Sequence, residues 1–138
     1  MNLVVDASVA ALWFLDEPLS DRASELPRFH DLSAPDFMAA ELANVLWKRV
    51  HRDPDARPED AAVFAAIQHV PVRFVATLPL VAAAGRMAVE LRHPVYDCLY
   101  LAVAEMQDAT VVTLDQRFLQ ATAGTCFEDR LMHLSELD

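Results

Sequence analysis

Short β-prone segments alternate with helical patterns along almost the whole chain. The β-prone segments are rich in valine and leucine and lie at residues 2–5, 32–35, 72–76, 110–114 and 131–134. Between them, helices are predicted over residues 8–15, 19–29, 37–51, 58–69, 80–91, 95–107 and 116–123. Such alternation is typical of parallel strands joined by crossover helices. The sequence therefore predicts a three-layer α/β fold with a mainly parallel central sheet.

Turn and capping residues separate these segments. Ser8 is predicted to cap the first helix, and Gly124 to close the last one. A polar connection with two prolines runs over residues 52–59, where Pro58 suits the first turn of the next helix. We interpret this connection as a loop and expect a single domain over residues 1–138, since this length fits one ordinary domain.

Composition narrows the class of protein. Apolar residues make up 54% of the chain, as in a globular protein. No basic residues precede the apolar segment at the beginning of the sequence, so this segment does not resemble a signal peptide. No apolar run approaches the roughly 20 residues that cross a bilayer, so we expect no membrane partner and a soluble cytoplasmic protein. Cys98 and Cys126 have no metal-ligand spacing, and we expect both to be reduced packing residues.

The net charge of −10 argues against long-range attraction to a polyanion. It does not exclude nucleic acid, because a divalent cation held by carboxylates can reverse the local field. The densest basic group is Lys48, Arg49 and Arg52. It could contact RNA phosphates, or it could be a solvated helix end favoured by the helix dipole.

Four acidic residues lie at the ends of β-prone segments or on apolar helix faces. Asp6 and Asp115 follow β-prone segments, at the edge where parallel sheets form their sites, although either could simply cap a helix. Glu41 and Asp97 interrupt the apolar faces of their helices. A single inward acid could instead pair with an arginine, for which the candidates are Arg49, Arg86 and Arg92.

Together, the four acids could converge into one carboxylate cluster. Like charges at close range raise some of the pKa values, and a hard cation such as Mg²⁺ resolves the repulsion. No histidine or cysteine pattern offers a competing zinc site. Ser8 and Thr113 could place hydroxyls near the cluster, although capping and strand packing are the favoured roles. We assign three large aromatic residues to the core: Trp47, Tyr96 and Tyr100.

Four stretches that carry these acids resemble PIN-domain proteins of the VapC toxin type. They are VVDASV, AELANVLWK, HPVYDCLYLAVAE and ATVVTLDQRF, and the resemblance covers nearly the whole chain. By this resemblance, Asp6 corresponds to the first metal-binding acid of the family and Glu41 to its helical glutamate. Asp97 and Asp115 correspond to the third and fourth acids.

The resemblance implies a PIN-like fold and a Mg²⁺- or Mn²⁺-dependent endoribonuclease. Such a protein is usually the toxin of a type II toxin–antitoxin pair, often a homodimer that a small antitoxin silences. A metal held by these acids would lower the pKa of a bound water, so that phosphodiester hydrolysis needs no serine or histidine nucleophile. If an antitoxin exists, we expect it to place a basic residue, an arginine, in the acidic pocket.

Three other functions are alternatives. A PIN nuclease could process RNA or cut DNA without being a toxin, and a partner-binding domain could keep the fold without catalysis. A phosphate-accepting signalling domain would need a second acid beside the first and a late lysine. Here Ala7 follows Asp6 and no lysine lies beyond Lys48, so this function is disfavoured.

Overall fold

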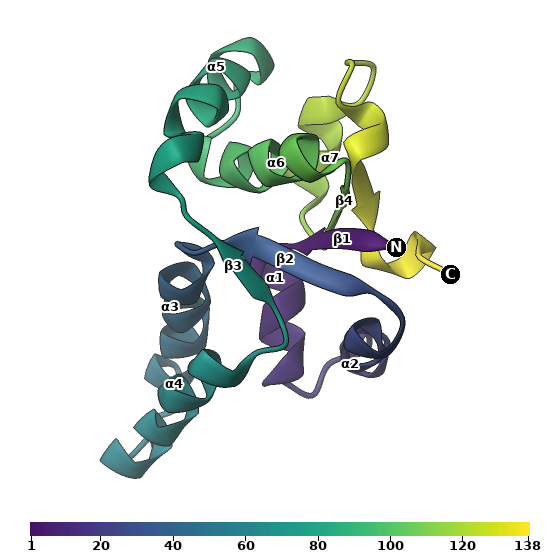
Figure 1. Ribbon diagram of the computed structural model, residues 1–138. Helices are drawn as coiled ribbons and strands as arrows, with labels where there is room; N and C mark the ends of the chain where they lie inside the picture. Colours follow the sequence, from purple (N-terminus) through teal and green to yellow (C-terminus); the bar gives the residue numbers. More distant parts are fainter.

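Five parallel strands form the centre of the computed structural model, which describes residues 1–138 (Figure 1). Their order in the sheet is β3 (Arg73–Val75), β2 (Asp31–Pro35), β1 (Asn2–Val5), β4 (Thr110–Thr113) and β5 (Leu131–His133). β1 is the middle strand, and Leu3 is in register with Leu32 on one side and Thr110 on the other. Every pairing is parallel, which confirms the predicted sheet.

Helices cover both faces of this sheet, so the three-layer prediction is also confirmed. In Figure 1, α5 to α7 lie above the sheet and α1 to α4 below it. The α-helices are α1 (Ala7–Ala10), α2 (Ser20–Phe29), α3 (Met38–His51), α4 (Ala62–Ala66), α5 (Val81–Leu91), α6 (Val95–Gln107) and α7 (Gln116–Thr122). The 3₁₀ turns are η1 (Ala11–Trp13), η2 (Pro58–Ala61), η3 (Ile67–His69), η4 (Leu78–Leu80), η5 (Glu128–Arg130) and η6 (Leu134–Glu136).

The first helix starts differently from the prediction. Its N-cap is Asp6, whose Oδ1 accepts a hydrogen bond from the Val9 N–H at 3.1 Å. Ser8 therefore lies inside the helix, and the prediction that it would cap this helix was wrong. After Ala10 the chain continues only as the 3₁₀ turn η1. The helix predicted over residues 58–69 is likewise divided, into η2, α4 and η3.

The core is centred on β1 and α6. Seven consecutive residues of α6, from Cys98 to Ala104, are buried, because this helix packs on the sheet with one side and against α5 with another. Tyr100 is fully buried, as expected, and Cys98 is a buried free thiol. Cys126 is exposed, so its assignment to packing was wrong.

The core assignment was also wrong for Trp47 and Tyr96, which are 49% and 66% exposed. The buried residues of α3 are Met38, Leu42 and Leu46, spaced four apart, and Trp47 lies about 100° around the helix from Leu46. Tyr96 precedes the buried run of α6, and its ring packs instead against Phe37 at 6.0 Å between centroids.

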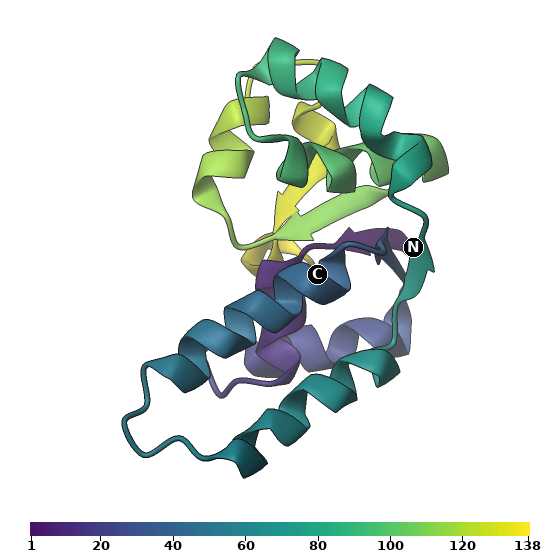
Figure 2. The same ribbon diagram turned by 90° about the vertical axis from the view of Figure 1, so that its left-hand side faces the viewer.

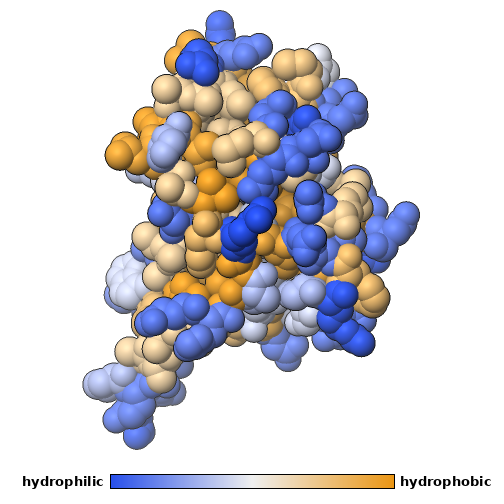
Figure 3. All heavy atoms as spheres, in the orientation of Figure 1, coloured by the Kyte–Doolittle hydropathy of each residue, from blue (hydrophilic) through white to orange (hydrophobic).

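Helices α3 and α4 run side by side and project away from the sheet (Figure 2). The connection over residues 52–57 forms the tip of this hairpin, which is hydrophilic in Figure 3 (lower left). It is a loop, as predicted. None of the helices combines the length and the apolar composition needed to cross a membrane.

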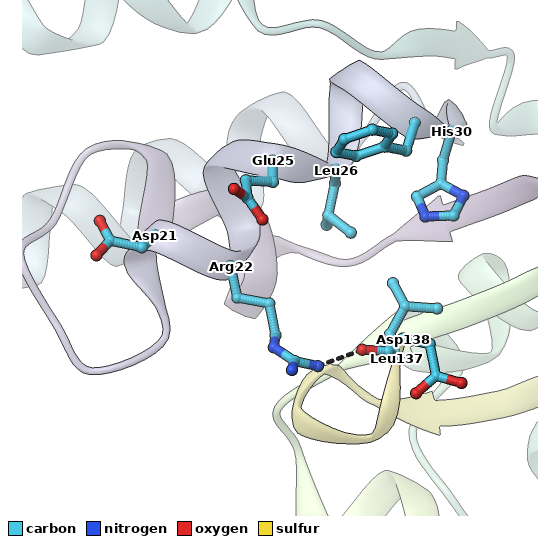
Figure 4. A pocket seen from close by; sticks show the side chains of 8 residues that line it. Asp21, Arg22, Glu25, Leu26, His30, Leu137 and Asp138 are labelled. Carbon is cyan, nitrogen blue, oxygen red and sulfur yellow. Dashed lines mark hydrogen bonds between the residues drawn. The ribbon is translucent and has the colours of Figure 1, made fainter.

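Arg22 of α2 fastens the end of the chain to the fold. Its Nη1 donates to the carbonyl oxygens of Leu134 at 3.2 Å and Ser135 at 3.1 Å. It also donates to the carbonyl oxygen of Leu137, the bond dashed in Figure 4. The cavity beside it, of about 500 Å³, lies between α2 and residues 137–138. Because one guanidinium satisfies several carbonyls, it holds η6 against α2.

We expect Arg22→Ala to lower the free energy of unfolding by about 1–2 kcal/mol, because charged hydrogen bonds to three partly buried or exposed carbonyls are lost. Urea unfolding measures the change, and hydrogen exchange of the Leu137 amide, which donates to the Leu134 carbonyl, should accelerate. Arg86→Ala is the control, since Arg86 forms no side-chain hydrogen bond or ion pair. Equal stability of the two variants would contradict this role of Arg22.

Candidate active site at the carboxyl edge of the sheet

Four acids line one pocket at the carboxyl ends of β1 and β4. Asp6 directly follows β1, and Asp115 lies two residues after the end of β4. Because the two strands are parallel neighbours, these residues emerge at the same edge. Glu41 of α3 and Asp97 of α6 line the same pocket, which has a volume of about 470 Å³. The structure thus brings together residues from both helical layers.

Asp6 is the most deeply buried of the four acids. Its carboxylate accepts hydrogen bonds from the Ser8 hydroxyl at 2.6 Å, the Val9 N–H at 3.1 Å and the Thr113 hydroxyl. Burial raises the pKa of Asp6 from 3.8 to about 6; the three hydrogen bonds lower this pKa, and the charge of Asp97 raises it further. No cation is among the groups that shift this pKa, so the Asp6 carboxylate has hydrogen-bond donors but no positive charge to offset its burial.

Ser8 and Thr113 both contact the cluster, although other roles were favoured for them. The Ser8 Oγ also accepts from the Leu114 N–H at 3.0 Å, and the Thr113 Oγ1 accepts from the Asp115 N–H at 3.0 Å. The two hydroxyls thereby join the Asp6 carboxylate to the backbone that leads into Asp115. This network fixes the end of β1 against the end of β4.

Glu41 is bound by a tyrosine. The buried Tyr100 hydroxyl donates to the Glu41 Oε1 at 2.6 Å. Burial raises the pKa of Glu41, the Tyr100 hydrogen bond lowers it, and the Asp97 charge raises it. Burial also raises the pKa of Tyr100, so this phenol stays neutral and remains a donor. The suggested pairing with Arg49 does not occur, because Arg49 pairs with Glu17.

Asp97 is bound by a histidine that the sequence analysis did not single out. The His93 Nε2 lies 2.6 Å from the Asp97 Oδ2. The His93 ring stacks on Phe118 of α7, with 5.2 Å between centroids and 9° between planes. Burial raises the pKa of Asp97, the His93 contact lowers it, and Asp115 raises it. The four-residue spacing of His93 and Asp97 was the sequence signal for this pair.

Asp115 caps α7, which was one of its two suggested roles. Its Oδ1 accepts from the N–H groups of Arg117 at 2.9 Å and Phe118 at 3.4 Å. Capping uses only one of its oxygens. Three carboxylate oxygens in the pocket form no hydrogen bond at all: the Glu41 Oε2, the Asp97 Oδ1 and the Asp115 Oδ2.

The donor set fits a hard divalent cation. All the acids present oxygen, three of their oxygens are free, and the pairs Asp6–Asp97, Glu41–Asp97 and Asp97–Asp115 repel one another. As the side chains lie, no group of three His, Cys, Asp or Glu residues is close enough together to hold one ion. The acids thus surround the pocket without forming a closed ligand shell.

The same pocket continues along α3 to a basic end. After Glu41, its lining includes Asn44, Val45, Lys48 and Arg49. Arg52, the third member of the basic group, does not line it. Lys48 and Arg49 therefore border the acidic site, whereas Arg52 lies at the solvated end of the helix.

Known proteins resemble this chain over nearly its full length. The family model for the PIN domain matches residues 3–124. Ribonuclease VapC3 of Pyrobaculum aerophilum is 30% identical over 127 residues, which are 87% of this chain and 94% of the relative. The crystal structure of PAE2754 from the same organism superposes with a TM-score of 0.68 at 26% identity, covering 98% of this chain and 93% of the other.

More distant structures share the fold. VapC20 of Mycobacterium tuberculosis, a toxin that cleaves the sarcin–ricin loop, has a TM-score of 0.66 at 20% identity, covering 93% of this chain and 98% of the other. VapBC2 of Rickettsia felis, solved with a DNA fragment from its promoter, has a TM-score of 0.64 at 14% identity and covers 96% and 98%. Since the family model spans most of the chain and the ribonuclease relative is matched almost completely, this chain belongs to the PIN-domain family.

Proposed function

We propose that this protein is a metal-dependent endoribonuclease that hydrolyses RNA phosphodiester bonds as the toxin of a type II toxin–antitoxin pair. The observation that carries the proposal is the convergence of Asp6, Glu41, Asp97 and Asp115 on one pocket. The similarity to Ribonuclease VapC3 supports RNA as the substrate.

We assign the four acids to the binding of Mg²⁺, for which Mn²⁺ could substitute. Asp6, Asp97 and Asp115 would hold the ion, and Glu41 would bind it directly or through a water. When bound, the ion supplies an activated water and stabilises charge on the phosphate oxygens. Glu41 Oε2, Asp97 Oδ1 and Asp115 Oδ2 are free to take part, because no protein donor occupies them.

The surrounding side chains hold the acids in position. Ser8 and Thr113 orient Asp6, Tyr100 orients Glu41, and His93 orients Asp97 through hydrogen bonds. Three of these partners are themselves restrained: Ser8 and Thr113 by hydrogen bonds from the backbone, and His93 by stacking on Phe118. Such support reduces the reorganisation that metal binding requires.

The charge of the pocket also suggests how the protein is silenced. Carboxylates without a compensating cation attract a guanidinium fork, so an antitoxin that inserts an arginine would compete with the metal. We further propose a homodimer and a single catalytic domain over residues 1–138, acting in the cytoplasm, where cellular RNA lies. An antitoxin gene beside the gene for this chain would distinguish a toxin from another PIN nuclease.

Asp97→Asn should reduce RNA cleavage by at least about 100-fold without unfolding the protein, because the amide keeps the shape but loses the ligand charge. Cleavage sites mapped on total cellular RNA, for wild type and variant, measure the effect. Asp129→Asn is the control, since Asp129 is exposed and outside the pocket. EDTA should abolish cleavage; full activity of Asp97→Asn, or cleavage in EDTA, would overturn the proposal.

The stabilisation of the fold by Mg²⁺ should increase with pH. Without metal, the pKa of Asp6 is raised from 3.8 to about 6, so the folded state favours the protonated carboxyl. Protonation of Asp6 therefore stabilises the metal-free fold, by at most about 3 kcal/mol. This stabilisation is fully present below pH 4 and is lost as the pH rises through 6. Burial raises the pKa values of Glu41 and Asp97 as well, with the same sign.

Because Mg²⁺ binds the ionised acids, the shift of the melting temperature by Mg²⁺ should be larger at pH 7.5 than at pH 5. Thermal unfolding with and without Mg²⁺ at both values tests this expectation. Asp6→Asn should remove most of the difference. An equal shift at both pH values would contradict metal binding by these acids.

His93→Asn should raise the Mg²⁺ concentration needed for half-maximal activity by about 10- to 100-fold, because Asp97 loses its orienting partner. Mn²⁺ binding followed by electron paramagnetic resonance provides a second readout that does not depend on cleavage. His69→Asn, at an exposed histidine outside the pocket, is the matched control. If His93→Asn changes stability but not metal affinity, His93 has only a packing role.

A further inference from the structure

The pocket of the four acids has two ends of opposite charge, and both lie on one face of α3. Glu41 stands at the acidic end, and Lys48 and Arg49 follow it by seven and eight residues. This spacing corresponds to two helical turns, or about 10–12 Å along the helix axis. The basic end therefore lies well beyond the reach of the acids but within the same pocket.

Neutral residues also line this pocket. Asn44 and Val45 come from α3, and Ala11, Leu12 and Leu15 come from η1 and the turn that follows it. A lining of this kind can cover a sugar and a base without competing for phosphate. The volume of about 470 Å³ lies within the range of pockets that hold small ligands.

The two basic residues differ in their partners. Lys48 forms no ion pair or side-chain hydrogen bond, so its ammonium is available to a ligand. Arg49 is paired with Glu17, which also lines the pocket. The side chains of Arg49 and Glu17 are 53% and 37% exposed, and an ion pair at such exposure contributes little stability. A phosphate could therefore replace Glu17 on the Arg49 guanidinium.

We propose that Lys48 and Arg49 bind an RNA phosphate that flanks the cleaved bond, and that Glu17 competes with this phosphate for Arg49. The inference rests on the proposed ribonuclease function. An endonuclease must hold a strand on both sides of the reacting phosphate, and the pocket extends from the acids along α3 to these two cations. Successive nucleotides advance by about 3.4 Å when stacked and by more when extended, so a phosphate two or three nucleotides away reaches the basic end.

The test measures binding, so that it is separate from cleavage. The probe is a fluorescent single-stranded RNA of about 12 nucleotides. Its binding is followed by fluorescence anisotropy in Mg²⁺ at several KCl concentrations. Every variant also carries Asp97→Asn, so that the RNA is not cut during the titration. Lys48→Gln and Arg49→Gln should each weaken binding by about three- to tenfold. Each should also flatten the dependence of log K on log salt by about 0.7, the value for one phosphate contact to a single strand.

Glu17→Gln should strengthen binding by about two- to fivefold, because it frees Arg49. The gain should vanish in the double variant Glu17→Gln/Arg49→Gln. Arg52→Gln is the matched control, since it removes one charge from the same helix end outside the pocket, and it should change the affinity less than about twofold.

Three results would overturn the inference. Equal effects of Lys48→Gln and Arg52→Gln would show a diffuse charge effect, and unchanged or weaker binding by Glu17→Gln would exclude the competition. A labelled poly-glutamate peptide that binds as tightly as RNA, with the same dependence on the variants, would assign the basic end to an acidic protein segment. If the wild-type chain cuts RNA but the variants bind it alike, only this inference fails; if RNA binds as expected and is never cut, only the proposed function fails.

Discussion

The burial of the Asp6 carboxylate between β1 and β4 is the constraint on which the rest of the site depends. A charge at the end of the central strand is costly unless polar groups meet it. Here the Ser8 and Thr113 hydroxyls and the Val9 amide do so, and the same hydroxyls accept from the backbone before Asp115. The hydrogen bonds that offset the burial of Asp6 thus also join the ends of the two strands. They thereby hold Asp6 and Asp115 at the same edge of the sheet.

Helix α6 combines the roles of core element and carrier of the site. Its residues from Cys98 to Ala104 are buried, so its position on the sheet is set by packing and not by the charge it carries. Asp97 lies directly before this buried run, and Tyr100 projects from within it to Glu41 of α3. A change in the packing of α6 would therefore move two acids at once.

Much of the fold could be predicted from the sequence, because hydrophobic periodicity is a local property. The bounds of β1 and α6 agree with the prediction, and the sheet is parallel as expected. The errors have local causes of another kind. Asp6 replaced Ser8 as the cap because its carboxylate reaches the Val9 amide, and Trp47 lies outside the core because the buried stripe of α3 passes through Leu46. Apolar character alone does not tell on which side of a stripe a large residue lies.

The sequence by itself determined the order in which strands and helices follow one another along the chain. It also determined where Asp6, Glu41, Asp97 and Asp115 lie relative to these elements. Only the tertiary structure decided which partner each acid has and which oxygens stay free. The partners come from distant parts of the chain: Thr113 lies 107 residues from Asp6, and Tyr100 lies 59 residues from Glu41. It also decided that Arg49 pairs with Glu17, 32 residues away, and not with one of the four acids. Such pairs depend on how the layers pack, and periodicity within one segment carries no information about that packing.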